Sequence, residues 1–433
     1  MMASSMLFKI VLISCLALAT AHKKEAPPAD ESSDSTASTG STGSNSFDVT
    51  KYSASSSGSA SANSKAFLDA FKAACKVKGQ STILVPKGTY KLGQITFEGP
   101  CQGSHITFDI QGTLEAPADA KEIPGNAWIE FDSLHEMVVK GGGILDGKGQ
   151  SSWPLETHNK PISMRFTKCV VGRVGDISIK DSKFFHMALH HTQGLIIENI
   201  KLSAPCNSKN TDGIHLSASS NITINNIDIG TGDDCISIGP GTNDVKISGV
   251  KCGPGHGISI GSLGKYKNEE NVANIHVKSC TINGATNGVR IKSWPGAAPS
   301  QASNIIFEDI TMTNVSYPII IDQKYCPNGE CTTHAPSQVK ISDITFKGIK
   351  GTSNTPIAVK LDCSEHSPCQ NVKLQDISLK PLTSAVDEIT SLCTNVHGDV
   401  SGTQSPDPCL GANAGKSSKS TSSGAPPPGA SDN

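Results

Sequence analysis

The middle of the chain repeats one pattern of apolar and polar positions. The pattern reads apolar, any, apolar, any, any, apolar, any, apolar. Octapeptides that fit it begin at Leu195, Ile222, Val245, Ile275, Ile305, Val339 and Val372. Their starting positions advance by 27, 23, 30, 30, 34 and 33 residues. Each octapeptide is typical of two short strands, rich in β-branched residues and joined at an Asn, Asp or Gly bend. Strand-only units at such a period indicate a solenoid.

A third strand lies between these units, in "DGIHL", "DCISI", "HGISI" and "GVRIK". Aligned, these segments form two apolar columns, and alternate residues form a polar one. The apolar columns are Ile214, Ile236, Ile258, Val289 and Leu216, Ile238, Ile260, Ile291; the polar column is His215, Ser237, Ser259, Arg290, with Lys292 next on the same side. Because side chains alternate along a strand, we expect the apolar columns to stack inside the coils and the polar column to point out to solvent. The pattern therefore predicts an all-β protein, a single right-handed parallel β-helix, whose first coil is capped by a short helix over residues 63–77.

The ends of the chain differ from this middle. Residues 1–21 have an early Lys9, a short apolar run and a small-residue site, which is typical of a secretory signal peptide. Residues 22–46 are rich in Ser and Thr and are expected to be disordered, as is the tail over 411–433. The β-helix is expected over 47–410. We therefore expect a secreted, extracellular protein with no membrane segment once the signal is removed.

Charge and cysteines limit the partners and the compartment. The net charge of −2 gives no broad basic field, so nucleic acid is a poor partner and a polyanion must be bound by local charges.

Of 14 cysteines Cys15 leaves with the signal, so an odd number remains and at least one thiol is free or pairs between chains. Short spacings suit local disulfides in an oxidising compartment, although connectivity does not follow from sequence. These spacings are Cys235/Cys252, Cys326/Cys331, Cys363/Cys369 and Cys393/Cys409.

Zinc is disfavoured because no CxxC pair or His cluster at ligand spacing is present. Asn221 and Asn314 begin glycosylation sequons.

Acidic residues recur just ahead of the third strand. Asp212 precedes one such strand, Asp233 and Asp234 precede the next, and His256 precedes the one after, with a spacing of 22 residues from 212 to 234 and again from 234 to 256. Since one coil adds about 4.8 Å along the axis, these groups should cluster on one face. Arg290 and Lys292 follow one coil further along.

Each of these residues also has a structural explanation. An Asp before a strand is usually a turn residue, and His256 in "GPGHGIS" could simply fit a tight Gly turn. Arg290 and Lys292 could form a solvated face. Together they favour chemistry, because three neighbouring carboxylates raise one another's pKa, which a purely structural arrangement avoids.

The same residues resemble the sequence motifs of a known enzyme family. "NTD" at 210–212, "GDD" at 232–234, "GHG" at 255–257 and "RIK" at 290–292, in this order and on these strands, resemble the four motifs of the polygalacturonases, glycoside hydrolase family 28. The similarity runs from "FDVTKY" at residue 47 to about Cys409 and is closest to the plant members. It implies hydrolysis of α-1,4 links between galacturonic acid units of pectin (polygalacturonate), with inversion, in the cell wall. It implies no cofactor and no metal, and we expect a monomer.

Carried over by position, the resemblance assigns a role to each motif residue. Asp233 is the general acid, Asp212 and Asp234 activate the attacking water, and His256 supports the acids. The expected substrate-binding residues are Arg290, Lys292, Tyr325 and Asn210. An acidic pH optimum is expected, because Asp233 must stay protonated while a partner is ionised. Adjacent coils at about 4.8 Å would by themselves favour retention over inversion, so inversion rests on the resemblance.

Departures and alternatives remain. The segment after "FDVTKY" departs from the family's usual turn, and Lys209 stands before "NTD" where a Pro is common. "RIKSWP" favours the pollen-type enzymes that act from chain ends, with an endo-acting enzyme as the alternative.

A rhamnogalacturonan hydrolase is the nearer alternative function. A pectate lyase would need a Ca²⁺ site. A catalytically silent pectin-binding wall protein is the alternative of another class.

Overall fold

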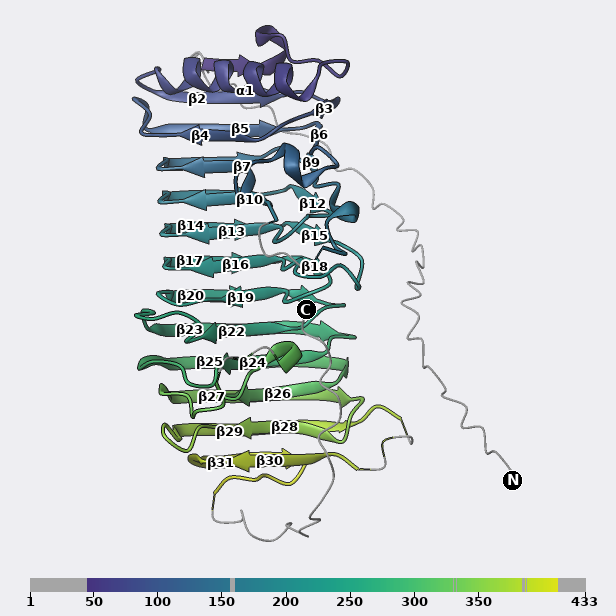
Figure 1. Ribbon diagram of the computed structural model, residues 1–433, viewed down its shortest axis with the longest axis vertical. Coiled ribbons are helices and arrows are strands. Elements are labelled where there is room, and N and C mark those ends of the chain that lie inside the picture. Colours follow the sequence, from purple (N-terminus) through teal and green to yellow (C-terminus); the bar gives the residue numbers. More distant parts are fainter. Residues whose placement is uncertain are drawn as a thin grey trace, which may run out of the picture. The chain divides into compact units, whose positions relative to one another are not determined.

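The computed structural model describes residues 45–155, 160–329, 331, 333–383, 386 and 388–411. The expected signal peptide and nearly all of both expected disordered segments lie outside these residues. The described residues form one stack of parallel β-coils, a right-handed parallel β-helix (Figure 1). The first strand begins at Asn45, two residues before the boundary expected at 47.

Each full coil contributes strands to three parallel faces. The first face holds β1 Asn45–Asp48, β2 Gln80–Val85, β5 His105–Ile110, β8 His135–Lys140, β11 Val170–Gly175, β14 Gln193–Glu198, β17 Ser220–Asn225, β20 Asn243–Ser248, β23 Val272–Asn283, β25 Ser300–Val315, β27 Val339–Ser353, β29 Cys369–Pro381 and β31 Val396–Ser405. The second holds β3 Thr89–Lys91, β6 Thr113–Glu115, β9 Ile144–Asp146, β12 Ser178–Lys180, β15 Lys201–Ser203, β18 Asp228–Gly230 and β21 Lys251–Cys252. From β23 onward the first and second faces are formed by one long bent strand.

The third face is a separate sheet, and it carries the candidate site. It holds β4 Ile95–Glu98, β7 Ala127–Asp132, β10 Ile162–Thr167, β13 Met187–His190, β16 Ile214–Ser217, β19 Ile236–Ile238, β22 Ile258–Leu263, β24 Asn287–Ser293, β26 Tyr317–Asp322, β28 Ile357–Asp362 and β30 Thr390–Thr394. The 3-10 turns are η1 Val49–Tyr52, η2 Ala120–Glu122, η3 Gly149–Ser151 and η4 Pro327–Gly329.

The predicted two-strand units are confirmed, with one error of register. β23 pairs with β25 through Ile275 and Ile305, as expected, but Ile305 then pairs with Ile344 rather than with Val339. Val339 pairs with Ser300 instead. The error arose because the apolar pairs of the long strand β27 recur every five residues, Val339 with Ile341 and Ile344 with Phe346, so the octapeptide pattern also fits one pair too early.

The apolar columns of the third sheet are confirmed. Ile214, Ile236, Ile258 and Val289 pair in register, as do Leu216, Ile238, Ile260 and Ile291, and all are buried. The polar column also pairs as predicted, but its exposure was predicted wrongly. Ser237, Ser259, Arg290 and Lys292 are only 3, 0, 3 and 6 % exposed. They point away from the coil interior, yet acids from the preceding turns cover and bind them.

One α-helix, α1 Ala60–Cys75, closes the N-terminal end of the stack (Figure 1). It begins three residues before the predicted start because the hydroxyl of Ser59 caps it, accepting a hydrogen bond from the Ala62 N–H. Phe67 and Phe71 are buried against the first coils, and the Phe71 ring lies 5.2 Å from that of Phe97. Within the described residues no helix is long and apolar enough to cross a membrane.

The bends between the first and second parts of each unit often adopt a left-handed conformation. A second row of left-handed residues lies near the start of the first-face strands: Asp244, Asn274 and Asn304 have φ of 55, 59 and 53°. The Asn274 amide donates to Asp244 at 2.9 Å, and the Asn304 amide donates to Asn274 at 2.7 Å. Asn and Asp tolerate this conformation and can bond their neighbours along the stack, which explains their recurrence.

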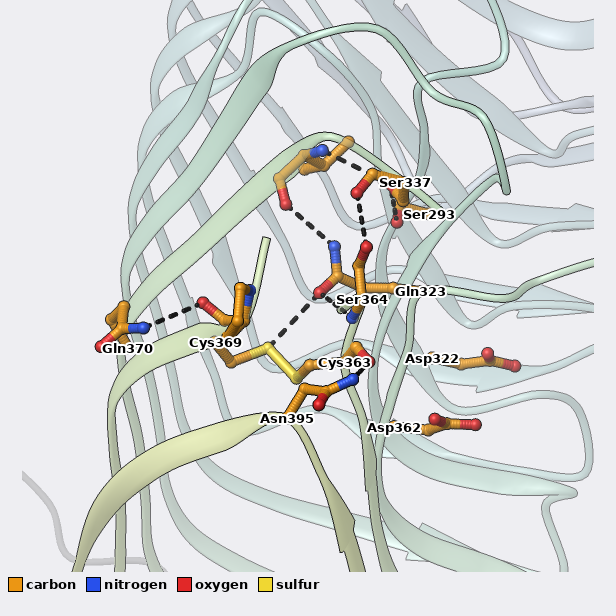
Figure 2. Close-up of a disulfide and its surroundings, with 12 residues drawn as sticks. Ser293, Asp322, Gln323, Ser337, Asp362, Cys363, Ser364, Cys369, Gln370 and Asn395 are labelled. Atoms are coloured by element: carbon orange, nitrogen blue, oxygen red, sulfur yellow. Dashed lines mark hydrogen bonds between the residues drawn. A yellow bond between two sulfur atoms is a disulfide. The ribbon is translucent and has the colours of Figure 1, made fainter. Parts of the chain in front are cut away.

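Four disulfides join the pairs with short spacings, and a fifth joins Cys75 at the end of α1 to Cys101. Within the described residues Cys169 and Cys280 are free buried thiols, in agreement with the expectation of at least one unpaired cysteine. Near the C-terminal end, the Cys363–Cys369 disulfide lies beside buried Gln323 (Figure 2). The Gln323 side chain donates to the Val339 carbonyl and accepts from the Ser364 N–H, so it links two successive coils.

Candidate active site

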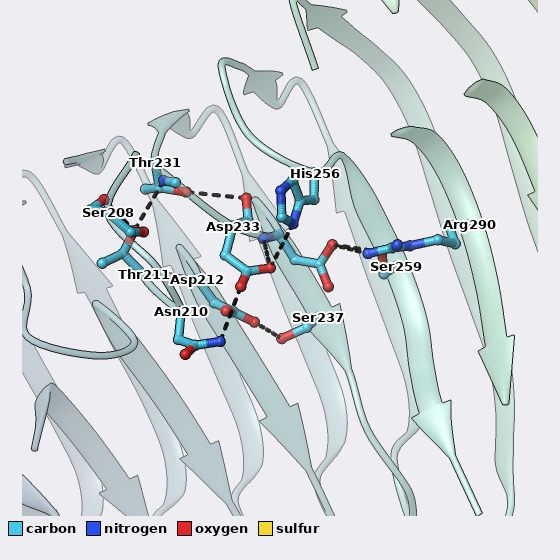
Figure 3. A network of polar contacts seen from close by, with 12 residues as sticks. Ser208, Asn210, Thr211, Asp212, Thr231, Asp233, Ser237, His256, Ser259 and Arg290 are labelled. Atoms are coloured by element: carbon cyan, nitrogen blue, oxygen red, sulfur yellow. Dashed lines mark hydrogen bonds and ion pairs between the residues drawn. The ribbon is translucent and has the colours of Figure 1, made fainter. Parts of the chain in front are cut away.

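The candidate acids occupy equivalent positions on successive coils. Asp212, Asp234 and His256 each lie two residues ahead of a strand of the third sheet, namely β16, β19 and β22. Those strands pair in register, so the structure brings the three residues together along the stack, as the 22-residue spacing predicted. Asp233 is adjacent to Asp234 and completes the cluster (Figure 3).

The backbone around the acids is fixed by its neighbours. The Gly213 N–H donates to the Asp234 carbonyl at 2.9 Å, and the His256 N–H donates to the Asp233 carbonyl at 2.9 Å. Cys235, next to Asp234, is disulfide-bonded to Cys252 on β21. A Cβ at Gly257 would lie 2.2 Å from the Asn287 carbonyl oxygen, so only glycine fits the close approach of these coils. These contacts leave the acidic side chains little freedom to move.

Asp234 is the most strongly bound of the carboxylates. Its Oδ1 accepts from Ser259 at 2.8 Å and from the Arg290 guanidinium at 2.9 Å, and its Oδ2 accepts from the Lys292 ammonium at 2.9 Å. The side chain is 2 % exposed, and burial alone would raise its pKa. The charges of Lys292 and Arg290 outweigh burial and hold the pKa of Asp234 below its usual value, so this carboxylate stays ionised.

Asp212 has the opposite electrostatic environment. It is 6 % exposed, and its Oδ2 accepts a 2.6 Å hydrogen bond from Ser237. Burial, followed by the nearby charges of Asp233 and Asp234, raises the pKa of Asp212 well above its usual value. The Ser237 bond and the charge of Lys292 act against this rise without cancelling it. The cluster therefore retains a proton at a pH where isolated carboxylates have lost theirs.

Asp233 is the most accessible of the three acids, at 9 % exposure. Its Oδ1 accepts from the Asp234 N–H at 2.7 Å and lies 3.0 Å from Nδ1 of His256. Its Oδ2 receives a long 3.4 Å contact from the Asn210 amide, which lies in a left-handed turn with φ of 58°. The structure thus brings His256 and Asn210, both expected site residues, to opposite oxygens of one carboxylate (Figure 3).

The expected substrate-binding residues also gather here. Nζ of Lys292 lies 5.0 Å from the centre of the Tyr325 ring, and Cζ of Arg290 lies 5.8 Å from it. Both cations bind Asp234 as well, which the sequence analysis did not anticipate. Trp294, which that analysis also missed, meets Tyr325 edge to face at 5.6 Å. The sequence signal for Trp294 was its position two residues after the "RIK" motif.

Ser237 and Ser259 are further side chains of the candidate site that the motifs did not point to. Each donates its hydroxyl hydrogen to an acid of the preceding coil. Their places in the polar column were predicted correctly, and two serines in line with an Arg and ahead of paired acids were a usable signal. The prediction that this column faces solvent concealed their role.

A metal ion fits these groups poorly. Asp233, Asp234 and His256 could each offer one ligand atom, all within 4.8 Å of one another. However, both oxygens of Asp234 already accept hydrogen bonds from cationic side chains. A divalent ion would therefore stand beside two fixed positive charges.

A groove of the described surface lies away from the carboxylate cluster. It has a volume of about 570 Å³ and follows the bends between the first and second faces. Asn199, Lys201, Asn226 and Asp228 are among its lining residues, and no site residue contributes to it. The carboxylate cluster is defined by its chemistry and not by the size of a cavity.

The fold and the cluster place this protein among the parallel β-helix solenoids that have acidic and basic side chains gathered along one face. Within that class the family is also clear. The chain belongs to the "Glycosyl hydrolases family 28", whose family model matches residues 75–405.

Similar proteins support this membership. The chain is 44 % identical to an "Exopolygalacturonase" of Platanus acerifolia, over 83 % of this chain and 96 % of that one. It is 46 % identical to an "Exopolygalacturonase" of Oenothera organensis (81 % and 99 % covered) and 46 % identical to a "Polygalacturonase" of Gossypium hirsutum (84 % and 90 % covered).

Solved structures confirm the fold. The crystal structure of a hyperthermoactive exopolygalacturonase from Thermotoga maritima matches with a TM-score of 0.67 at 18 % identity, over 78 % of this chain and 87 % of that one. A polygalacturonase from Erwinia carotovora matches with a TM-score of 0.63 at 23 % identity, over 86 % and 100 %.

Proposed function

We propose that this protein hydrolyses α-1,4 galacturonosyl links of polygalacturonate, with inversion, and that it acts from chain ends. The observation that carries the proposal is the carboxylate cluster, in which the pKa of Asp212 is raised and that of Asp234 is lowered. Paired carboxyl groups whose pKa values are driven apart suit general acid–base catalysis. Family membership and the names of the similar proteins agree with this chemistry, and those names favour chain-end action.

The roles follow from accessibility and charge. Asp233, the most exposed acid, protonates the leaving glycosidic oxygen, and His256 and Asn210 orient its two oxygens. Asp212 and Asp234 hold and activate the attacking water. Asp212 activates water only as a carboxylate, so its raised pKa makes activity fall as the pH drops through that range, whereas at higher pH the general acid loses the proton that the leaving group needs. The expected optimum is therefore acidic.

The substrate carboxylate binds beside the same cations. A guanidinium binds carboxylates bidentately and an ammonium binds them as a point charge, so Arg290 and Lys292 suit the recognition of a sugar carboxylate. Tyr325 supports both cations from one side. Local charges of this kind allow a chain with a net charge of −2 to bind a polyanion.

The expected location is the cell wall, reached by secretion. If the chain is exported, Asn221 is the better of the two glycosylation sequons. Asn221 is exposed, whereas Asn314 is half-buried and its Oδ1 accepts from the Asn354 amide at 2.8 Å. A glycan at Asn221 and none at Asn314 is therefore expected.

The test is hydrolysis of de-esterified polygalacturonate at pH 5 with EDTA present, following reducing ends and viscosity together. Reducing ends that rise while viscosity hardly falls indicate action from chain ends, and a rapid fall in viscosity indicates internal cleavage. Asp233→Asn should lower the rate at least about 100-fold. Asp228→Asn, an exposed acid on β18, is the matched control and should keep full activity.

A wild-type protein that releases no reducing ends under these conditions, while still binding the polymer, would favour the silent pectin-binding alternative. Activity that requires added Ca²⁺ would favour a lyase. The anomer of the first product, read by proton NMR, distinguishes inversion from retention.

A further inference from the structure

A hydrogen-bonded column runs beneath the carboxylates. His215, Ser237, Ser259 and Arg290 pair in register on β16, β19, β22 and β24. Each serine donates to the acid that precedes the adjacent strand. Ser237 donates to Asp212 at 2.6 Å, and Ser259 donates to Asp234 at 2.8 Å. The two acids are therefore held by equivalent serines one coil apart.

Each serine is in turn oriented by the residue at one end of the column. A serine hydroxyl has a single hydrogen, and when the carboxylate receives it the oxygen can only accept from its other neighbour. Nε of Arg290 donates to Ser259 at 3.0 Å. Nδ1 of His215 lies 2.8 Å from Ser237 Oγ. With Asp212 ionised, His215 must therefore carry its hydrogen on Nδ1 and donate it.

The two ends of the column differ in charge. Arg290 is a permanent cation and also binds Asp234 directly. His215 is neutral in the working pH range, because burial, with smaller effects of His190 and Lys292, lowers its pKa to about 4 despite the opposing charge of Asp234. Its ring stacks on Phe185 with centres 4.8 Å apart, which fixes the imidazole plane.

We propose that His215 is a positioning residue for Asp212, acting through Ser237 to hold the serine hydroxyl on the carboxylate in its ionised, water-activating form. This role rests on the proposed function. Asp212 faces the charges of Asp233, Asp234 and Lys292, none of which would change in a His215 variant. Without the imidazole donor, the Ser237 hydroxyl is free to turn away, and ionised Asp212 loses a hydrogen bond that stabilises it.

Two substitutions of His215 distinguish its hydrogen bond to Ser237 from its packing against Phe185. His215→Phe keeps a ring to stack on Phe185 but removes the donor, whereas His215→Asn keeps an amide donor near the position of Nδ1. For His215→Phe we expect kcat to fall about tenfold with little change in KM. The acidic limb of the kcat/KM profile should move up by about half a pH unit or more. His215→Asn should recover most of the activity and the wild-type limb.

Two further variants complete the design. Ser237→Ala should give the same shift, and the double variant His215→Phe/Ser237→Ala should add little to it, because both changes break one chain of hydrogen bonds. His135→Asn, an exposed histidine on β8, is the control that should behave as wild type. Melting temperatures identify any variant that fails to fold.

A readout without turnover tests the hydrogen bond itself. In ¹⁵N-labelled protein at pH 6, the resonances absent from His215→Asn belong to His215, and their shifts should report a neutral ring protonated on Nδ1. Protonation on Nε2 instead, or a His215→Phe variant with unchanged kcat and pH profile in an active enzyme, overturns the inference. A wild type inactive on polygalacturonate counts against the proposed function, while the tautomer result still decides the hydrogen bond.

Discussion

Asp212 and Asp234 are equivalent residues with opposite electrostatics. Each lies two residues ahead of a third-sheet strand, and each accepts from a serine of the next strand. Arg290 and Lys292 reach Asp234 and lower its pKa, whereas burial, followed by the charges of Asp233 and Asp234, raises the pKa of Asp212. The chemistry of the cluster depends on where the two cations lie and not on the acids alone.

Replacing Asp212 should therefore weaken catalysis and strengthen the fold. Because the pKa of Asp212 is raised above its ordinary 3.8, ionising it costs the folded state free energy as the pH rises through that range. Asp212→Asn should lower kcat at least about 100-fold and raise the free energy of unfolding at pH 7 by about 1 kcal/mol. Urea unfolding from pH 3 to 7 measures this, and the gain should vanish near pH 3. An equal gain at both ends of the range would contradict the electrostatic explanation.

At the scale of the element, short strands are joined by bends that most residues could not adopt. Asn274, in the row near the start of the first-face strands, shows how such a position is stabilised, because its left-handed backbone suits Asn and its amide group bonds both the coil before and the coil after. The same device, with Asn371 donating to Asp343, recurs on later coils. Rows of such residues fix the position of each strand on its neighbour, which in turn sets the alignment of the acids.

Two variants of Asn274 separate backbone strain from hydrogen bonding. Asn274→Ala should lower the free energy of unfolding by about 2 kcal/mol, because it loses both bonds and leaves a Cβ in a left-handed bend. Asn274→Gly should cost only about 1 kcal/mol, since glycine accepts that conformation. Chemical denaturation of both measures the difference. Equal losses would mean that the backbone conformation carries no cost here.

At the scale of the whole molecule, the stack has an inner core that must be closed at its ends. α1 covers the first coils, and its Phe71 starts a series of aromatic contacts through Phe97, Phe108 and Phe131. The ring of Phe131 continues onto Phe166 at 5.1 Å. Solenoids lose stability from uncapped ends, because each coil is stabilised only by its neighbours.

Opening this cap should destabilise the protein from its N-terminal end. Phe71→Ala removes a ring that is 4 % exposed and should lower the free energy of unfolding by about 3 kcal/mol. Lys72→Ala, on the exposed side of the same helix, is the matched control and should change it by less than about 0.5 kcal/mol. Hydrogen exchange should quicken first in β2 and β5. Exchange that quickens equally along the whole stack would argue against local opening.

Much of the fold could be predicted because its signal repeats. Ile214, Ile236 and Ile258 align by simple counting, since a period-2 strand on a repeating coil leaves one consistent alignment. Counting failed at Val339, because the apolar pairs of this long strand recur every five residues, and only the pairing of Ser300 with Val339 and of Ile305 with Ile344 decides the frame. The helix start was missed by three residues because the Ser59 cap lies in a run of small polar residues with several possible caps.

The sequence by itself determined the solenoid and the cluster of Asp212, Asp233, Asp234 and His256, because these depend on order and spacing along the chain. The tertiary structure alone decided the burial of the polar column, the binding of both cations to Asp234, and the link from His215 to Asp212. Those depend on which atoms of neighbouring coils come within hydrogen-bonding distance, and on the low local dielectric that follows from burial. Spacing places a residue on a coil, but only packing determines whether its charge is exposed to water or to another side chain.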